Sequence, residues 1–306
     1  MIGGDASTGP AALAAPLLRY YAARIARARR PFVLGISGLQ GSGKSTLARA
    51  LLREARRRGL SAVALSLDDV YHGRRARAAL ARRVHPLFAT RGVPGTHDLA
   101  LLTRTLEALA RASPRRPARL PRFDKGRDTR KPPSHWPRVA RAPDLIVLEG
   151  WCLGLRPQRA QALSVPVNAL ERREDADGRW RRAVDRALRA YQPLWRRLHA
   201  LVLLAAPSFA VVRRWRGEQE RALRRRGAPR AMDAAALDRF IAHYERLGRH
   251  ALATLPPRAD VRIELDAARR VLRAFGTSCR PRGMDRSIPG IKPARPPPPC
   301  RRPAPR

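Results

Sequence analysis

Five short runs of apolar residues lie along the first 265 residues and predict strands. They cover residues 32–37, 62–67, 144–148, 200–205 and 260–265. The first four are apolar almost throughout, without alternating polar residues, which is typical of strands buried on both faces of a sheet. Because longer stretches separate the runs, we expect an α/β fold in which helices flank a mainly parallel sheet.

The stretches between the strands show the apolar spacing of helices. Apolar residues three or four positions apart predict helices over residues 47–55 and 99–109. A third helix is expected to begin with Ser208 as its N-cap and to stop at Gly227, and a fourth is expected to follow Asp233. All four would pack on the sheet.

Two segments lack the pattern of a packed core. The connection between the second and third strands is far longer than usual, and its second half, residues 111–141, carries eleven Lys and Arg against two Asp. We expect an irregular basic lobe there, which would carry substrate-specific residues. Residues 277–306 are rich in proline and arginine, so we predict a disordered tail.

The net charge of the chain is unusually high. The sequence holds 64 Lys and Arg against 24 Asp and Glu, a formal charge of +40, which by itself favours a nucleic acid as partner. Only four of the basic residues are lysines, however, and the arginines spread along almost the whole chain. Aromatic residues for base stacking make up only 5% of the sequence. The composition therefore argues against a specific nucleic-acid partner.

The cysteines and the apolar segments give no sign of metal, redox or membrane chemistry. Cys152, Cys279 and Cys300 lack metal-ligand spacing and form no C-x-x-C pair. No basic segment precedes the apolar residues near the N-terminus, and no apolar run is long enough to span a bilayer. We therefore expect a reduced, cytoplasmic protein without membrane contact.

The strongest motif follows the first predicted strand. Residues 38–45, GLQGSGKS, fit the P-loop pattern G-x-x-x-x-G-K-[ST] between a strand and a helix. Backbone N–H groups of such a loop surround phosphates, and the helix N-terminus adds a partial positive charge. Lys44 would neutralise the β- and γ-phosphates, and the Ser45 hydroxyl would ligate Mg²⁺. The motif therefore predicts binding of Mg²⁺ and ATP.

Acidic residues follow two other predicted strands. Glu149 ends the third strand, and Asp68 and Asp69 follow the second, so all three lie at the sheet edge where ligands of open α/β sheets bind. Glu149 would either serve the metal site or cap a helix. Asp68 would either accept or orient a substrate hydroxyl, or belong to a solvated turn. The spacing leaves open which aspartate acts on the substrate.

A turn-rich loop at residues 91–99 precedes the second helix. Thr96 or Asp98 is expected to cap that helix, which leaves Arg91 and His97 for contact with an anionic substrate.

Two other charged segments have both a functional and a structural interpretation. Residues 123–130, FDKGRDTR, are in isolation typical of a solvated charge run. Arg213, Arg216, Glu220 and Arg224 share one face of the third helix, which is either an exposed ion-paired face or an arginine lid over the triphosphate.

Together these strings resemble the D-glycerate 3-kinases of bacteria, fungi and plants. This family is a branch of the P-loop kinases that also includes phosphoribulokinase, uridine kinase and bacterial pantothenate kinase. Its more specific strings are RGVPGTHDL at residues 91–99, FDKGRDTR at 123–130 and EGWCLG at 149–154. The resemblance covers residues 31–252, whereas the first thirty residues match weakly and the tail has no counterpart.

The resemblance implies a role for each candidate residue. Asp68 is the carboxylate nearest the accepting hydroxyl, and Lys44 and Glu149 complete the catalytic set, with Ser45 and Glu149 at the metal. The expected ATP contacts are Gly38, Gln40, Gly41, Ser42, Gly43, Lys44, Ser45 and Thr46, with Arg213 and Arg216 from the lid. The expected substrate contacts are Asp69, Tyr71, Arg91, His97, Asp98, Lys125, Asp128 and Arg130.

The implied activity is transfer of the γ-phosphoryl group of ATP to D-glycerate, which yields 3-phosphoglycerate. Two alternatives stay open: another hydroxyl kinase of the same superfamily, acting on pantothenate, uridine or a sugar phosphate, and a P-loop ATPase that binds nucleic acid. The oligomeric state is also open.

The expected organisation has three parts. A helical segment at residues 1–30 precedes a P-loop kinase domain at 31–275, and the disordered tail begins at 276. The kinase domain would contain a long insert at residues 68–143 and a lid at 207–232.

Overall fold

The computed structural model describes residues 9–29, 31–225, 232–276 and 286–287. Within these residues, a seven-stranded sheet of order β11-β10-β9-β8-β1-β7-β2 forms the centre of the protein. The strands from β9 to β2 run parallel, and β10 and β11 add an antiparallel edge. The strands are β1 (Phe32–Gly38), β2 (Ala62–Ser66), β7 (Leu145–Gly150), β8 (Ala200–Ala205), β9 (Val261–Leu265), β10 (Val271–Gly276) and β11 (Arg286–Ser287). The mixed α/β class with a mainly parallel sheet is thus confirmed.

The five predicted strands are present, with ends that shift by one or two residues. β1, β7 and β8 are buried along their whole length, as their apolar sequences predict. The same prediction is wrong for β2, which is only partly buried because it forms the edge of the sheet. β10 was not predicted from the apolar pattern, since its burial is irregular.

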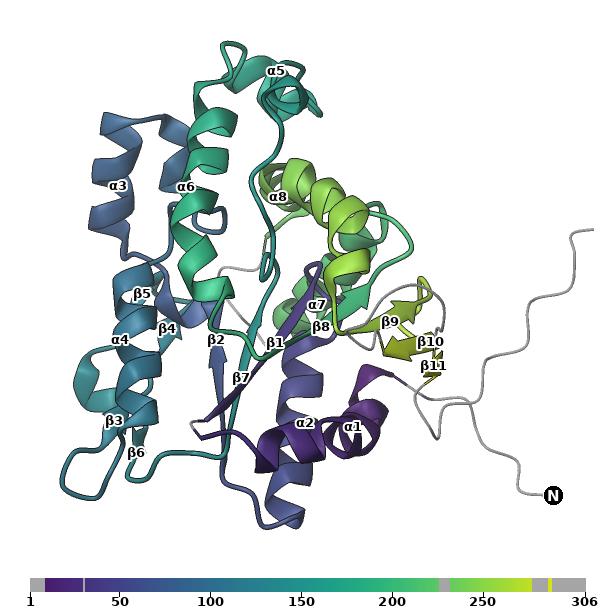
Figure 1. The fold of residues 1–306 in the computed structure, drawn as a ribbon. Helices are drawn as coiled ribbons and strands as arrows, with labels where there is room; N and C mark the ends of the chain where they lie inside the picture. The colour runs from purple at the N-terminus through teal and green to yellow at the C-terminus, as the bar shows by residue number, and fades with distance from the viewer. Residues whose placement is uncertain (1–8, 30, 226–231, 277–285, 288–306) are drawn as a thin grey trace, which may run out of the picture.

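Helices surround the sheet and occupy two regions of the molecule. Figure 1 shows α1 and α2 in the lower part and α3, α5, α6 and α8 in the upper part. α2 packs against α1 and against β1, β2 and β7. The helices are α1 (Ala14–Ala26), α2 (Lys44–Arg57), α3 (Arg74–Arg83), α4 (Leu99–Ala110), α5 (Ala169–Glu174), α6 (Arg179–Trp195), α7 (Val211–Arg225) and α8 (Ala234–Thr254).

The four predicted helices correspond to α2, α4, α7 and α8. Asp233 caps α8, since its side chain accepts a hydrogen bond from the backbone N–H of Ala236. The predicted start of α7 at Ser208 is wrong: the helix begins at Val211, because a turn at Phe209 comes first and its carbonyl accepts from the N–H of Val212. The predicted stop at Gly227 lies outside the described residues.

The long insert between β2 and β7 is only partly irregular. It contains η2 (Leu67–Val70), α3, η3 (Pro86–Ala89) and α4, followed by two small antiparallel pairs. One pair joins β3 (Ala118–Arg119) to β6 (Arg138–Val139). The other is a hairpin of β4 (Phe123–Asp124) and β5 (Thr129–Arg130), which we call the β4–β5 hairpin. The predicted basic lobe is therefore built from short strands and turns.

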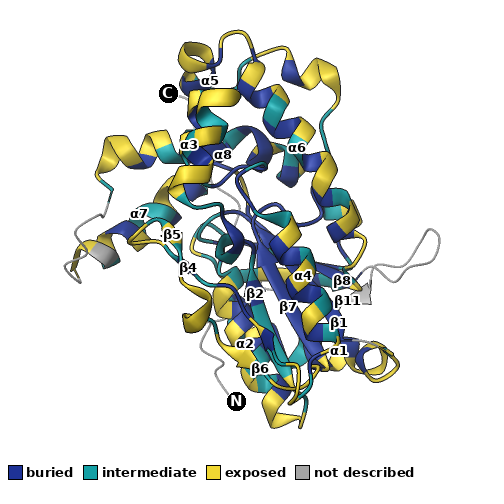
Figure 2. Ribbon diagram, turned by 90° about the vertical axis from the view of Figure 1, so that its left-hand side faces the viewer, coloured by how far each residue is buried: buried dark blue, intermediate teal, exposed yellow. Residues whose placement is uncertain are grey.

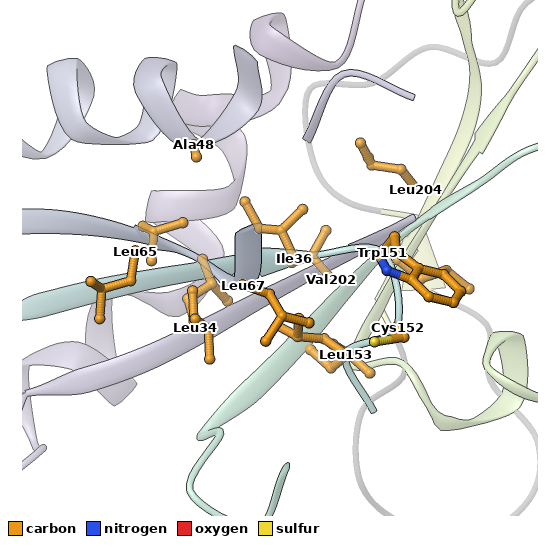
Figure 3. Packing of buried hydrophobic residues seen from close by; sticks show 14 of the residues in the cluster. Leu34, Ile36, Ala48, Leu65, Leu67, Trp151, Cys152, Leu153, Val202 and Leu204 are labelled. Atoms are coloured by element: carbon orange, nitrogen blue, oxygen red, sulfur yellow. The ribbon is translucent and has the colours of Figure 1, made fainter. Parts of the chain in front are cut away.

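One hydrophobic core joins the sheet to its helices. In Figure 2 the buried residues follow the central strands, whereas exposed residues lie on the outer faces of the helices. Figure 3 shows Leu34 and Ile36 of β1, Val202 of the neighbouring strand β8, and Leu65 of β2, which is separated from β1 by β7. All four side chains are buried, so the carboxyl ends of these strands are held on a rigid base.

The N-terminal part that is described contains the turn η1 (Pro10–Leu13) and α1. Of the predicted tail, only Arg286 and Ser287 are described, and they pair with β10. The remaining residues after 276 lie outside the described part of the chain. No helix in the described ranges combines the length and the apolar character that crossing a membrane requires.

Candidate active site

The phosphate loop connects β1 to α2, as predicted. Gly41 and Gly43 have φ angles of 81° and 96°, which favour glycine over residues with a side chain. A Cβ atom at Gly41 would also lie 2.6 Å from the Cβ of Trp215 on α7. Gln40 has an amide whose nitrogen and oxygen are buried without a hydrogen-bond partner among the described residues. The loop thus offers polar groups suited to an anionic ligand.

Lys44 and Ser45 begin α2 and point toward the end of β7. The Lys44 ammonium donates a hydrogen bond of 3.0 Å to the Leu39 carbonyl, and the Ser45 hydroxyl donates one of 2.9 Å to Glu149 Oε1. Burial lowers the pKa of Lys44, although Glu149 and Asp68 oppose this shift. Glu149 lies within β7 and is 7% exposed, so it is not a helix cap. The structure therefore brings together the three groups that the P-loop interpretation requires.

The donor set at this point fits a magnesium ion that is bound together with a nucleotide. Ser45 and Glu149 supply a hydroxyl and a carboxylate oxygen, which are hard ligands of the kind Mg²⁺ prefers. Across the described ranges, no group of three or more His, Cys, Asp or Glu side chains could hold a metal by itself. Mg²⁺ commonly takes one or two protein oxygens and completes its shell with waters and substrate phosphates, so a two-residue site is sufficient.

Asp68 lies in η2, directly after β2, and both of its carboxylate oxygens accept hydrogen bonds. The Tyr71 hydroxyl donates to Oδ1 at 3.1 Å, and the Lys125 ammonium donates to Oδ2 at 2.6 Å. Burial raises the pKa of Asp68, but Lys125 outweighs it with help from His97 and Lys44, so the pKa falls to about 2. Asp68 is therefore ionised at neutral pH.

Asp69 has a different environment from its neighbour. Its carboxylate lies 3.2 Å from the Arg122 guanidinium and accepts a hydrogen bond of 3.3 Å from the backbone N–H of Phe123. Burial raises the pKa of Asp69, and Arg122 opposes that shift. Asp69 thus attaches the β4–β5 hairpin to η2, and Asp68 is the aspartate that faces the phosphate loop.

A single cavity joins the phosphate loop to Asp68. Its volume is about 170 Å³, which is enough for a small molecule of a few heavy atoms. From the predicted residues it is lined by Gln40, Gly41, Lys44, Ser45, Asp68, Tyr71, Arg91, Lys125, Glu149 and Arg216. The phosphate loop and the candidate acceptor residues therefore share one space.

Besides Asp69, four predicted substrate contacts lie behind this lining. His97 stacks on Tyr71 with ring centroids 4.4 Å apart, and burial lowers its pKa to about 3, so it is neutral at pH 7. Asp98 caps α4, as predicted, and pairs with Arg130 at 3.1 Å. Asp128 forms ion pairs with Arg77 and Arg91, which lie earlier in the insert. These four residues support the cavity wall instead of lining it.

The arginines of α7 divide between the two interpretations. Arg216 lines the cavity, bonds Glu220 at 2.6 Å, and has an Nε that is buried without a partner in the described part of the chain. Arg213 is exposed and pairs with Asp238 of α8 at 2.6 Å. The exposed Arg224 bonds the Met232 carbonyl. The structure places Arg216 at the phosphate loop and leaves Arg213 and Arg224 outside the cavity.

Sequence analysis missed several lining residues: Gly150, Trp151, Gln219, Phe240 and Tyr244. Phe240 and Tyr244 lie within α8, where helical spacing predicts the helix but does not mark these two residues as part of a site. Their partners are distant in sequence, since the Tyr244 hydroxyl donates to the Arg91 carbonyl and Arg216 lies over the Phe240 ring. For Gly150 and Trp151 the sequence did contain a signal that they belong to the site, because they directly follow Glu149.

The phosphate loop at the carboxyl end of a mainly parallel sheet places the protein in the P-loop class, and its relatives are kinases. Among known proteins, the uncharacterized kinase mug58 of Schizosaccharomyces pombe is 37% identical over 224 residues, which cover 70% of this chain and 79% of that protein. The chloroplastic D-glycerate 3-kinase of Arabidopsis thaliana is 32% identical over 223 residues, which cover 70% of this chain and 46% of that protein. No protein-family model matches the chain.

Two solved structures share the fold. The D-glycerate 3-kinase of Cryptococcus neoformans superposes with a TM-score of 0.71 at 22% identity, over 90% of this chain and 100% of that one. The YGR205w protein superposes with a TM-score of 0.69 at 23% identity, over 88% and 98% of the two chains. The sequence match shows that the chain belongs to the kinase family that includes mug58, and it is similar to the plant D-glycerate 3-kinase. ATP is the phosphate donor that this family implies.

Proposed function

We propose that this protein is a D-glycerate 3-kinase, which transfers the γ-phosphoryl group of ATP to the 3-hydroxyl of D-glycerate. The observation that carries the proposal is the shared cavity, with the phosphate loop on one side and Asp68, Arg91 and Lys125 on the other. Glycerate is a small carboxylate with hydroxyl groups. Its site needs a cation that binds the carboxylate and a group that accepts the proton of the reacting hydroxyl. The similarity to the plant enzyme supports the same substrate.

The nucleotide side would act mainly through position and charge. Phosphoryl transfer passes through a loose transition state, so catalysis depends on alignment and on neutralising the phosphate oxygens. Lys44 would bind the β- and γ-phosphates, and Arg216 would face the same oxygens from α7. Ser45 and Glu149 would hold Mg²⁺, which would supply positive charge to neutralise the phosphate oxygens.

The acceptor side would orient the attacking hydroxyl. The substrate oxygen forms a bond to the γ-phosphorus while the bond to the oxygen bridging the β- and γ-phosphates breaks, and Asp68 receives the hydroxyl proton. Because its pKa is about 2, Asp68 is a weak base that mainly accepts a hydrogen bond until late in the transfer. Arg91 would bind the acceptor carboxylate, since a guanidinium matches a carboxylate with two parallel hydrogen bonds.

A coupled ADP-release assay with a panel of acceptors tests this proposal. The panel contains D-glycerate, L-glycerate, glycerol, pantothenate, uridine and ribulose 5-phosphate, each with Mg²⁺ and ATP. We expect the highest kcat/KM with D-glycerate and only background release with glycerol, which lacks the carboxylate. A higher kcat/KM with any other acceptor would reject D-glycerate as the substrate.

A further inference from the structure

Asp128 lies at the centre of an arginine cluster on the outer side of the cavity wall. Its carboxylate forms ion pairs with Arg77 and Arg91, and Arg74 Nε lies 4.0 Å away. Asp128 does not line the cavity, whereas Arg91 does. The resemblance to glycerate kinases implied substrate contact for Asp128, but its position suggests that it acts on another residue.

Arg77 fixes one side of this cluster. Its side chain is 3% exposed and donates hydrogen bonds to the Ala89 carbonyl at 3.1 Å and to the His72 carbonyl at 2.7 Å, in addition to Asp128. His72 lies between η2 and α3, and Ala89 is the last residue of η3, so Arg77, which is itself on α3, joins three parts of the insert. A buried arginine with three partners has little freedom to move. Asp128 is therefore attached to a rigid anchor.

Arg91 is restrained at both its backbone and its guanidinium. The Arg91 carbonyl accepts a hydrogen bond of 3.2 Å from the Tyr244 hydroxyl, and the Gly92 carbonyl accepts one of 3.0 Å from Trp151 Nε1. The guanidinium pairs with Asp128 and lies 5.6 Å from the centre of the Phe123 ring. Since the backbone is held from α8 and from the end of β7, Asp128 supplies the ionic contact that sets the direction of the side chain.

We propose that Asp128 is a positioning residue that aims Arg91 into the cavity and thereby sets the affinity for the acceptor's carboxylate. The inference rests on the proposed function, because it takes the acceptor to be an anion bound by Arg91. An arginine held in its binding orientation loses less conformational entropy when it grips a carboxylate. Asp128 acts on the acceptor and leaves the nucleotide side unaffected.

The backbone conformation at Asp128 allows a substitution that removes the charge and keeps the turn. Its φ angle is 53°, in the left-handed region that Asp and Asn adopt more readily than other side-chain-bearing residues. Asp128→Asn therefore keeps the turn and the size of the side chain and removes only the charge. Asp124→Asn is the matched control, because Asp124 lies in the same β4–β5 hairpin and accepts a hydrogen bond from the backbone N–H of Arg127.

The first measurement compares steady-state constants of the full-length variants. Asp128→Asn should raise the KM for D-glycerate about tenfold, with kcat and the KM for ATP within about twofold of the unsubstituted protein. Asp124→Asn should leave all three constants within about twofold. An unchanged KM for D-glycerate in Asp128→Asn, or an equal rise in both KM values, would overturn the inference.

The second measurement repeats Asp128→Asn in an Arg91→Ala background, using kcat/KM at low acceptor concentration. If Asp128 acts through Arg91, its substitution should change kcat/KM by less than about twofold in that background. The same loss in both backgrounds would show that Asp128 acts independently of Arg91 and would refute its positioning role.

Failure of the proposed function gives a different result, since the unsubstituted protein would then not phosphorylate D-glycerate. If the panel identifies another carboxylate or phosphate acceptor, the same cycle is run with that acceptor and the same outcomes apply. An uncharged acceptor would overturn both proposals.

Discussion

The two sides of the cavity are built in different ways. The nucleotide side comes mainly from nine consecutive residues, 38–46, on a strand, a loop and the first turn of a helix. The acceptor side combines η2, the loop before α4, the β4–β5 hairpin and α8, which are far apart in sequence. The nucleotide side is therefore specified mainly by local sequence, with Arg216 added from α7, whereas the acceptor side exists only after the insert and α8 have packed together.

The cations on the two sides also have different partners. On the nucleotide side Lys44 donates to a backbone carbonyl, whereas Lys125 and Arg91 on the acceptor side each pair with a carboxylate of that side. An ion pair fixes a cation in place and reduces the net charge that the cavity presents. Removing a cation should therefore lower activity more on the nucleotide side. On the acceptor side, removing a carboxylate should lower activity as much as removing its cationic partner.

The largest effect is expected at Lys44. Lys44→Ala removes the charge that neutralises the transferred phosphate, so kcat/KM should fall on the order of 10³-fold without loss of folding. Lys44→Arg should also lose most activity, because the wider guanidinium does not replace a compact ammonium. Stopped-time ADP assays measure kcat/KM, and circular dichroism shows whether the variants are folded.

Lys131→Ala is the matched control, since Lys131 is an exposed lysine that does not line the cavity. It should retain full activity. Retention of activity in Lys44→Ala as well would remove the phosphate loop from the mechanism.

The next effect separates two adjacent carboxylates on the acceptor side. Asp68→Asn should lower kcat by about 10² to 10³-fold, because the hydroxyl loses its proton acceptor. Asp69→Asn should lower kcat by less than about tenfold, since Asp69 contacts only the hairpin in this region. The same initial-rate assay measures both variants. Equal losses, or a greater loss at Asp69, would reverse the assignment.

A smaller effect is expected within α7. Arg216→Ala should lower kcat/KM by about 10 to 100-fold, because Arg216 faces the phosphate loop. Arg213→Ala removes an equal charge one turn earlier and should change kcat/KM by less than about twofold, because its partner is the exposed Asp238. If both variants lost activity equally, the lid would require more than the one arginine that lines the cavity.

The smallest effect is a change in pH dependence. With Lys125 present, the pKa of Asp68 is about 2, so Asp68 stays ionised and kcat/KM should not fall through its protonation between pH 8 and pH 5. In Lys125→Met the raising effect of burial is no longer outweighed by Lys125, so the pKa rises and the acid limb of kcat/KM should move up by about one pH unit or more.

Lys131→Met should leave that profile unchanged, because Lys131 belongs to the same basic lobe and does not line the cavity. The shape of the pH profile is compared, since the absolute rate also reflects substrate binding. An acid limb at the same pH in Lys125→Met and in the unsubstituted protein would contradict the role of Lys125 as the group that lowers the pKa of Asp68.

The same contrast explains what could be predicted from the sequence. The phosphate loop, Glu149 and the four central strands follow from local motifs and apolar runs, and each lies where it was expected. The roles of His97 and Asp128, and the ion pair of Asp98 with Arg130, could not be predicted from spacing. Their positions depend on partners 30 or more residues away, such as Tyr191, Arg130 and Arg91. The edge position of β2 likewise depends on the whole sheet.

Local sequence also left the charged helix α7 undecided. Arg213 and Arg216 lie three residues apart on the same face of α7. Arg216 lies over the ring of Phe240 and lines the cavity beside the phosphate loop, whereas Arg213 does not line the cavity. Packing of α7 against α8 makes that distinction, and no pattern within α7 contains it.

The most direct test of the shared cavity identifies the product by phosphorus and proton NMR after reaction with Mg²⁺, ATP and D-glycerate. The proposed function predicts equal amounts of ADP and 3-phosphoglycerate, with phosphate attached at the 3-hydroxyl. Release of ADP and inorganic phosphate without a phosphorylated acceptor, or attachment at the 2-hydroxyl, would contradict the proposed placement of the acceptor between Asp68 and the phosphate loop.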